Sequence, residues 1–194
     1  MKKTTVTIPM SEYKFMDVTI IGAHPLISGR YDGTKQDDKM KDTMTDEMKF
    51  ESSIYRTSDG KYGFPSAAIK KAMVSTAKEF KKSKKVKGID GTSAKVIFFI
   101  ENEEIIPIET KKPTIRIGAA KTKDGHKVKT VNAEYPTGWK MVLKIRFNSL
   151  LTDAETILMT LVEAGKTVGL GVMRPQTQGL VFGTFNVATA EVIE

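Results

Sequence analysis

Gly165-Lys-Thr-Val-Gly-Leu-Gly-Val-Met-Arg-Pro-Gln-Thr-Gln-Gly-Leu-Val-Phe-Gly-Thr-Phe185 is the stretch around which the chain is organised. It holds five of the fifteen glycines, at 165, 169, 171, 179 and 183. Glycine loses more backbone freedom on folding than any other residue, so a cluster this dense predicts backbone at positive φ or in close contact with another segment. Arg174 lies in the middle, and Pro175 stiffens the chain after it. Two interpretations stay open: a loop that grips a partner, and a tight connection within the fold.

Length and composition predict one globular domain. The chain has 194 residues, of which 40% are hydrophobic and 28% charged, and no internal repeat. It contains no cysteine, which excludes disulfides, thiolate metal sites and cysteine nucleophiles. No apolar run approaches the length of a membrane span, and residues 1–8 lack the apolar core of a secretory signal. We therefore expect a cytoplasmic protein with no membrane partner.

The positive charge of the chain is concentrated in two segments. The net charge is +8, and residues 61–90 carry nine lysines against two acids. Residues 111–129 carry seven Lys or Arg against Asp124 alone. Two acidic segments, 37–51 and 101–109, offset them. Such concentration favours a polyanionic partner, although a solvated lysine-rich surface has the same composition.

Two segments have the pattern of amphipathic helices. Within 62–80, apolar residues recur at spacings of three and four, which predicts a helix with one buried stripe and with Pro65 near its start. Lys70 and Lys71 fall outside that stripe. The second helix opens with the capping-box sequence Thr152-Asp-Ala-Glu155, and Gly165 is its expected end.

Several segments alternate as strands. Residues 15–21 and 139–147 each present one apolar face, and 94–100 is apolar on both faces, which predicts a central strand. Residues 105–108 contain Pro107, which favours a sheet edge. Residues 182–192 form the expected last strand. The order strand, helix, strands, helix, strand predicts an α+β fold: a ferredoxin-like or RRM-like antiparallel sheet with two main helices.

Two insertions interrupt this pattern. Residues 30–53 have no sustained period, so we expect an inserted flexible segment, in which methionines at spacing four leave room for a helix ordered on contact. At 111–133, two short strands flank Asp124-Gly125, a strong hairpin signal. We expect a projecting basic β-hairpin. The prediction is a single domain over 1–194 with these two insertions.

Catalytic chemistry has little support in the sequence. The only imidazoles are His24 and His126, without the spacing of a metal site. Gly169-Leu-Gly171 lacks the rest of a dinucleotide fingerprint, and no P-loop Gly-Lys-Ser/Thr occurs. We expect no enzyme activity, no cofactor and no metal site.

Nucleic-acid binding has more support, because phosphate contacts need Lys and Arg spread over a surface, and base stacking needs aromatic rings or Arg planes. The stacking candidates are Tyr31, Tyr55, Tyr62, Tyr135 and Arg174. The candidate nucleic-acid-binding residues are Lys70, Lys71, Lys121, Lys123, Lys127, Lys129, Lys140, Lys144, Arg146 and Arg174, together with the glycine-rich loop of Gly169, Gly171, Gly179 and Gly183. No duplex-reading motif occurs, which favours a single strand of RNA or DNA.

Three motifs together resemble the RAMP superfamily, the RNA-binding backbone subunits and repeat-RNA processing proteins of CRISPR systems. They are Gly22-Ala-His-Pro-Leu26, Gly63-Phe-Pro-Ser-Ala-Ala-Ile-Lys70 and the late glycine stretch. The family's loop is a G-x-G followed by another G-x-G. Here Gly169-Leu-Gly171 fits, whereas Gly179-Leu-Val-Phe-Gly183 departs from it. The chain also looks like small phage-encoded proteins that share a G-φ-G-x-x-R-P run.

The resemblance implies a non-catalytic protein of a bacterium or an infected bacterial host that assembles along a single strand as a homo-oligomer or filament. A hairpin would reach over the ligand or a neighbour. One alternative is a protein-interaction module, for example a phage protein that occupies a host effector complex. The second is a metal-independent endoribonuclease, although the family's usual histidine in the first helix has no counterpart between Pro65 and Lys82.

Overall fold

A four-stranded antiparallel sheet with two helices on one face forms the centre of the fold. The computed structural model describes residues 12–30, 44–82, 91–121 and 125–193. The central elements in chain order are β1 (Tyr13–Gly22), α3 (Ser66–Lys82), β5 (Phe98–Ile100), β9 (Lys140–Asn148), α5 (Ala154–Glu163) and β10 (Phe185–Ile193). The sheet order is β10-β1-β9-β5, and all three pairings are antiparallel. This βαββαβ order, with its fourth, first, third and second strands side by side, agrees with the predicted ferredoxin-like fold.

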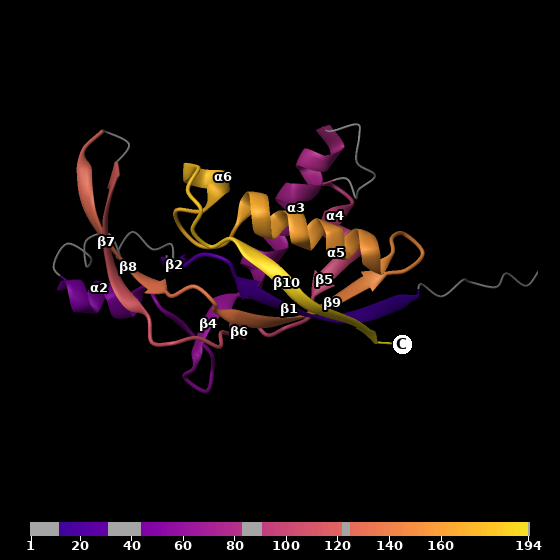
Figure 1. The fold of residues 1–194 in the computed structure, drawn as a ribbon, viewed down its shortest axis with the longest axis horizontal. Helices are drawn as coiled ribbons and strands as arrows, with labels where there is room; N and C mark the ends of the chain where they lie inside the picture. The colour runs from indigo at the N-terminus through magenta and orange to yellow at the C-terminus, as the bar shows by residue number, and fades with distance from the viewer. Residues whose placement is uncertain (1–11, 31–43, 83–90, 122–124, 194) are drawn as a thin grey trace, which may run out of the picture.

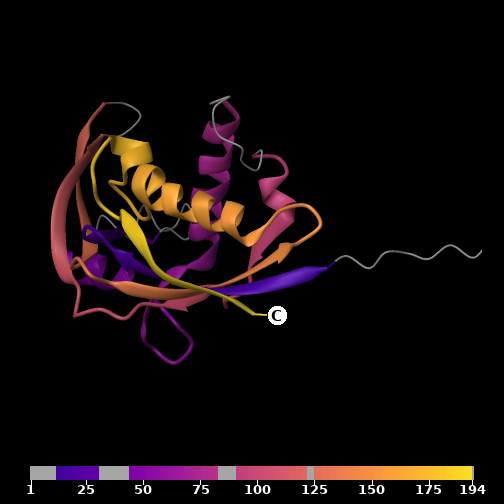
Figure 2. The same ribbon diagram turned by 45° about the vertical axis from the view of Figure 1, so that its right-hand side comes forward.

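Alternating side chains place the core between this sheet and its helices. On β1 the predicted face of Met16, Val18 and Ile20 is buried, and on β9 the alternate residues from Met141 to Phe147 are buried. These residues pack with the stripe of α3 and the inner face of α5 in one cluster. Figures 1 and 2 show both helices on the same side of the sheet. Burial of a continuous apolar face on each element stabilises the fold.

Two smaller sheets extend the molecule. One has the order β2-β8-β7, from β2 (Leu26–Ser28), β7 (Thr114–Lys121) and β8 (Lys127–Tyr135). Its β7 and β8 form the predicted hairpin, which projects at one end of the molecule in Figure 1. The other has the order β3-β4-β6, from β3 (Tyr55–Arg56), β4 (Tyr62–Pro65) and β6 (Ile105–Pro107). As expected from Pro107, β6 lies at a sheet edge.

The prediction of a central strand over 94–100 is wrong. Residues Ala94–Ile97 form one helical turn, α4, and only β5 continues as a strand, at the edge of the main sheet. Ala94 and Ile97 are buried, and their spacing of three places them on one side of a helical turn. The β-branched and aromatic composition concealed this turn, because a short apolar run does not separate helix from strand.

The second helix starts and ends later than predicted. Its N-cap is Asp153, whose side chain accepts a hydrogen bond from Thr156 N at 2.7 Å, so the cap lies one residue after Thr152. Gly165 does not end the helix. It lies within a π-helical turn, η1 (Ala164–Val168), which ends at Gly169 with φ +67°. A Cβ at Gly165 would lie 2.3 Å from Phe185 O, so this glycine allows β10 to approach the helix.

Part of the segment expected to be flexible is a helix. Residues 46–52 form α2 (Asp46–Ser52), and the remainder of the predicted excursion at 31–43 lies outside the described residues. Thr45 caps α2, and acidic side chains occupy its first turn, where the helix dipole favours them. Phe50 is buried against Val131 and Ala133 of the hairpin in a second small core. The sequence did not predict α2, because the helix is held by the single buried side chain of Phe50 and has no long hydrophobic period.

Two parts of the glycine stretch, residues 169–172 and 183, meet the distant residues 25–27, and we call this meeting the glycine crossing. Main-chain hydrogen bonds join them, from Gly183 N to Pro25 O, Leu170 N to Gly183 O and Val172 N to Ile27 O, at 2.8 to 3.0 Å. Both Gly171 and Gly183 have positive φ, and an added Cβ would lie 2.2 Å from Ile27 O and 1.9 Å from Leu170 O respectively. Only glycine fits these two positions. At Gly171 and Gly183, the glycines therefore serve a tight connection within the fold.

Among the helices in the described part of the chain, none has the length and apolar character needed to cross a membrane.

We expect Gly183→Ala to lower the free energy of unfolding by roughly 3 kcal/mol or more, since it adds a backbone clash to the strain of positive φ. Gly179 is the matched control, because it also has positive φ but nothing lies within 4 Å of an added Cβ. Gly179→Ala should cost only about 1–2 kcal/mol. Urea denaturation followed by circular dichroism measures both. An equal loss of unfolding free energy in both variants would contradict the close backbone contact at Gly183 as the cause.

Candidate nucleic-acid interface

A groove with a cavity volume of about 700 Å³ runs between α3 and the glycine stretch. One face of α3 forms one wall, with residues at helical spacing from Ala67 through Lys71 to Lys78. Residues 168–172, with Arg174 and Gln176, form the other wall. The glycine crossing therefore sets the distance between the walls, because it fixes the second wall against β2.

The groove is positively charged. Its lining includes five cationic side chains and no aspartate or glutamate among the described residues; the cations are Lys70, Lys71, Lys78, Lys95 and Arg174. Lys71, Lys78 and Lys95 are exposed. Cations without neighbouring carboxylates attract phosphate groups, and the walls of a groove focus that field.

Lys70 serves the fold more than the groove surface. Its ammonium group donates hydrogen bonds to Ala94 O and Phe98 O and lies 3.5 Å from the centre of the Phe98 ring. Burial lowers the pKa of Lys70 to about 8 from its ordinary value of 10.5. The side chain thus ties α3 to α4 and β5 and leaves only one of its three donors for a ligand.

Arg174 is held in place within the second wall. It is the N-cap residue of α6 (Pro175–Gln178), and Pro175 occupies the first position of that short helix. Its Nη1 donates to Gly171 O at 2.8 Å, and the side chain is half-buried. A guanidinium has five N–H donors, so this bond orients the group and leaves further donors on a side chain that lines the groove.

The amides of the glycine stretch are largely used within the fold. Gly169 N donates to Ala164 O, and Leu170 N and Val172 N donate within the glycine crossing. Gly179 N donates to Pro175 O and caps α6. These amides do not face a ligand, so the cationic side chains dominate the interface.

The structure separates the five stacking candidates. Tyr55 and Arg174 both line the groove. Tyr135 is fully buried, and its ring meets that of Tyr62 edge-to-face at 6.0 Å. Tyr31 lies outside the described residues.

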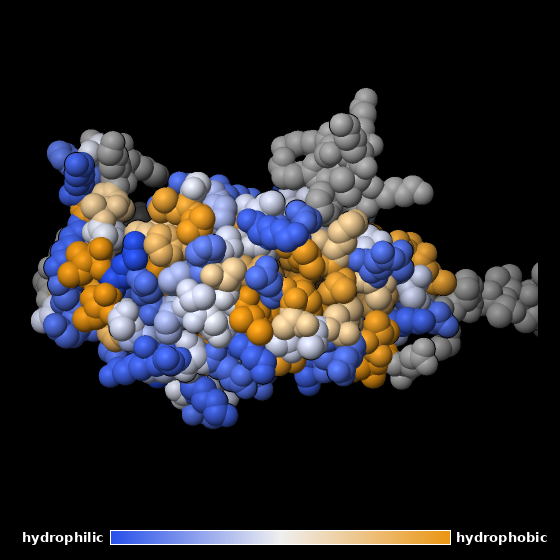
Figure 3. All heavy atoms as spheres, viewed as in Figure 1, coloured by the Kyte–Doolittle hydropathy of each residue, from blue (hydrophilic) through white to orange (hydrophobic). Residues whose placement is uncertain are grey.

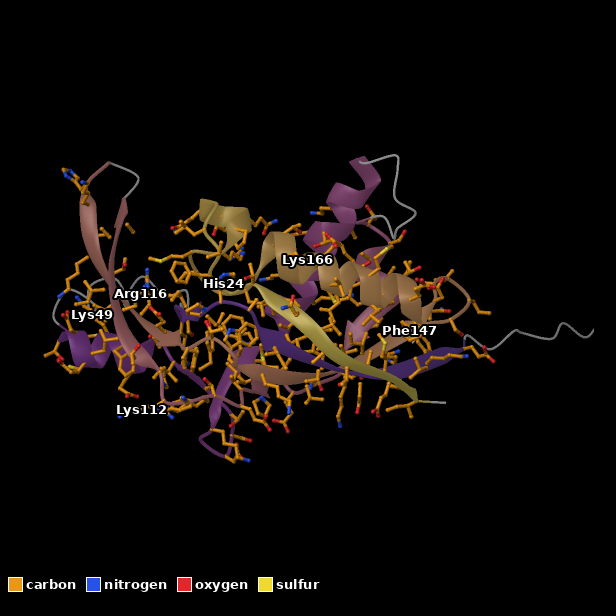
Figure 4. All side chains as sticks on the ribbon, in the orientation of Figure 1. His24, Lys49, Lys112, Arg116, Phe147 and Lys166 are labelled. Atoms are coloured by element: carbon orange, nitrogen blue, oxygen red, sulfur yellow. The ribbon has the colours of Figure 1, made fainter. Side chains whose placement is uncertain are left out.

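The hairpin carries its own cations beside the glycine stretch. Lys127 and Lys129 are exposed, and Lys129 forms an ion pair with Asp46. The side chains of Lys121 and Lys123 lie outside the described part. Arg116, which Figure 4 labels on the hairpin, pairs with Glu134 at 2.8 Å and stacks over Phe182 at 4.4 Å. These contacts join the hairpin to the end of the glycine stretch.

The three candidates on β9 lie away from the groove, on the face of the main sheet opposite α3 and α5. Lys140 pairs with Glu109 at 3.1 Å, and Arg146 pairs with Glu101 at 2.7 Å. Arg146 also lies over the rings of Tyr13 and Phe99. Lys144 is exposed between them. Because carboxylates offset two of these three cations, the sheet face attracts phosphate less than the groove does.

Sequence reasoning did not single out Lys78, Lys95 and Gln176, which line the groove. Lys78 was detectable, because it lies seven residues after Lys71 and so on the same side of the helix. Lys95 was not, because its segment has the composition of a strand. Gln176 was not detectable either, because only the turn of α6 brings it to the groove.

In the described ranges, no three His, Asp or Glu side chains gather closely enough to hold a metal ion.

No protein-family model matches this sequence, and no curated protein does. Among solved structures, the chain is similar to one chain of a cryo-electron microscopy structure of the Type III-B Cmr-beta bound to cognate target RNA. The two share a TM-score of 0.49 and 13% sequence identity, and the match covers 94% of this chain and 61% of the other. This chain thus spans about three fifths of the length of that neighbour, and the likeness concerns the arrangement of elements alone.

The pKa of Lys70 predicts a change of stability with pH. Because its folded-state pKa of about 8 lies below the ordinary 10.5, the unfolded chain holds more protons between these values. The contribution of Lys70 to the free energy of unfolding therefore rises with pH across this window. We expect the wild-type protein to gain stability relative to Lys70→Met between about pH 7 and about pH 10, in urea denaturation. If the free energy of unfolding changes with pH equally in the wild type and in Lys70→Met, the lowered pKa of Lys70 is contradicted.

Proposed function

We propose that this chain binds single-stranded RNA or DNA in the groove beside α3, without catalysing a reaction, and that copies assemble along the strand. The observation that carries the proposal is the groove lining, with five cations and no carboxylate among the described residues. Phosphate contacts of this kind supply most of the affinity in sequence-independent binding. A cavity of about 700 Å³ has the size of a small-molecule site, so it accepts a short length of single strand and not a double helix.

Two further observations support this proposal. The basic hairpin contacts the end of the glycine stretch through Arg116 and Phe182, and its exposed Lys127 adds positive charge there. Residues of two RAMP-like motifs, Pro65 and Gly169-Leu-Gly171, line the groove on its two walls. Assembly along the strand rests on that resemblance.

A protein-interaction module is the second candidate, and exposed apolar side chains favour it. Ile115, Ile117 and Val128 on the hairpin have 43 to 59% of their surface exposed. Figure 3 shows apolar residues at the hairpin end of the molecule, and others over the middle and the opposite end of the same face. A nuclease has less support, since no histidine or carboxylate lines the groove among the described residues. Metal-independent cleavage of RNA by the pure protein would establish it instead.

The groove lysines are tested by charge reversal. We expect Lys71→Glu with Lys78→Glu to weaken binding of a labelled single strand and to lower the slope of log affinity against log salt by about two, one for each lysine that no longer neutralises a phosphate. Fluorescence anisotropy between about 50 and about 200 mM salt measures this slope.

The matched control is Lys140→Glu with Lys144→Glu, which changes the same charge on the opposite face of the sheet. We expect this pair to retain most of the affinity. An equal loss in both pairs would contradict the groove as the site. Absence of binding by the wild-type protein at low salt would favour the interaction module.

Assembly along the strand predicts a change of mass. We expect light scattering on a complex with a long single strand to give, after the mass of the strand is subtracted, a multiple of 21.5 kDa that rises with strand length. Electrostatic cover of one strand by several copies accounts for this dependence. A complex of one chain per strand at every length would contradict assembly.

A further inference from the structure

Tyr55 gives the groove an aromatic end. It lies on β3, pairs with Gly63 of β4, and lines the groove together with Phe64 and Pro65, just before α3 begins. Its ring meets that of Phe64 edge-to-face, with centroids 5.9 Å apart and planes 72° apart. This contact fixes the orientation of the ring. Tyr55 is only partly buried and is among the residues that line the groove.

Arg174 supplies a second planar group to the same groove. Its bond to Gly171 O and the stiff Pro175 hold the guanidinium in place before any ligand arrives. An arginine plane stacks on a base as an aromatic ring does, and it also adds positive charge. Fixed groups lose little conformational freedom when they bind, which favours recognition of a planar ligand.

Polarity changes along the groove. Its wall near the start of α3 consists of Tyr55, Phe64, Pro65 and the alanines 67 and 68. Lys71 and Lys78 follow at roughly 6 and 17 Å farther along the helix axis from Ala67, at 1.5 Å a residue. An aromatic, apolar end followed by cations matches a ligand that has a planar apolar part and phosphate groups.

We propose that the start of the groove binds one unpaired nucleobase of the strand against Tyr55 and Arg174, while Lys71 and Lys78 contact its phosphates. This inference rests on the proposed function and adds to it a contact with the base. A base in a double helix has both faces covered by its neighbours, so such a site selects single strands. Since every base has a π face, the site is tolerant of sequence.

The test compares strands with and without bases. The probes are labelled oligonucleotides of about 15 nucleotides, oligo-dT and oligo-rU, beside an abasic strand of the same length and charge. We expect the wild-type protein to prefer the strands with bases. Tyr55→Leu should weaken binding of those strands by about 5- to 100-fold and leave the abasic strand unchanged. Tyr55→Phe keeps the ring and should bind as the wild type does.

Tyr13→Leu is the matched control, because Tyr13 is an exposed tyrosine on the opposite face of the main sheet, over Arg146. It should bind all strands as the wild type does. Thermal melting checks that each variant folds, since Tyr55 also packs against Phe64. Should Tyr55→Leu unfold, photo-crosslinking of wild-type protein to an oligonucleotide with 5-iodouracil gives the answer, with Tyr55 as the expected site.

The outcomes separate the two proposals. If Tyr55→Leu retains the preference for bases, or if the crosslink maps to Tyr13 or the hairpin, the base site is wrong while strand binding stands. If wild-type protein binds the abasic strand equally well, the groove contacts phosphates only, and the base site is again overturned. If the wild-type protein binds no strand at low salt, the proposed function fails and the base site fails with it.

Discussion

The close approach of three backbone segments at the glycine crossing is the constraint on which the structure depends. Gly171 passes over Ile27, and Gly183 passes over Leu170, at distances that leave no space for a Cβ. The connection from α5 to β10 therefore packs directly on β2 and on Pro25, the residue before it. Because β10 pairs with β1 at one edge of the main sheet, this crossing also holds that edge strand in place. Side chains at these positions would force the segments apart.

The crossing also builds one wall of the groove. Residues 169–172 are held by main-chain bonds, so Arg174 and Gln176 follow at a fixed distance from α3. The opposite wall is equally fixed, since the buried stripe of α3 anchors the helix to the sheet. Both walls are thus held by contacts within the fold, and pre-organised groups lose little conformational freedom on binding, which favours the proposed function. The glycines thus shape the site, although their own amides are mostly bonded within the fold.

The basic residues of this chain have unequal surroundings despite equal charge. Those of α3 face a groove with no carboxylate in its described lining, whereas Lys140 and Arg146 of β9 have glutamate partners from the acidic segment 101–109. On the hairpin, Lys129 pairs with Asp46 of α2. Exposed ion pairs contribute little to stability, but they reduce the local attraction for phosphate. The acidic segments therefore concentrate the positive field of the chain at the groove.

The local sequence pattern predicted the two main helices, β1 and β9, which have a sustained hydrophobic period. It also predicted the hairpin, through the turn signal at Gly125. Their order sufficed for the fold, because a βαββαβ sequence with apolar faces has few ways to bury them. The short helices α4 and α2 could not be predicted, because each is held by only one or two buried side chains. Their packing partners are distant in sequence, as Val131 is from Phe50 of α2. The sequence also indicated which residues carry positive charge. Which cations share a surface, and which have a carboxylate beside them, was decided by tertiary structure alone, because ion pairs such as Lys140 with Glu109 join residues on different elements.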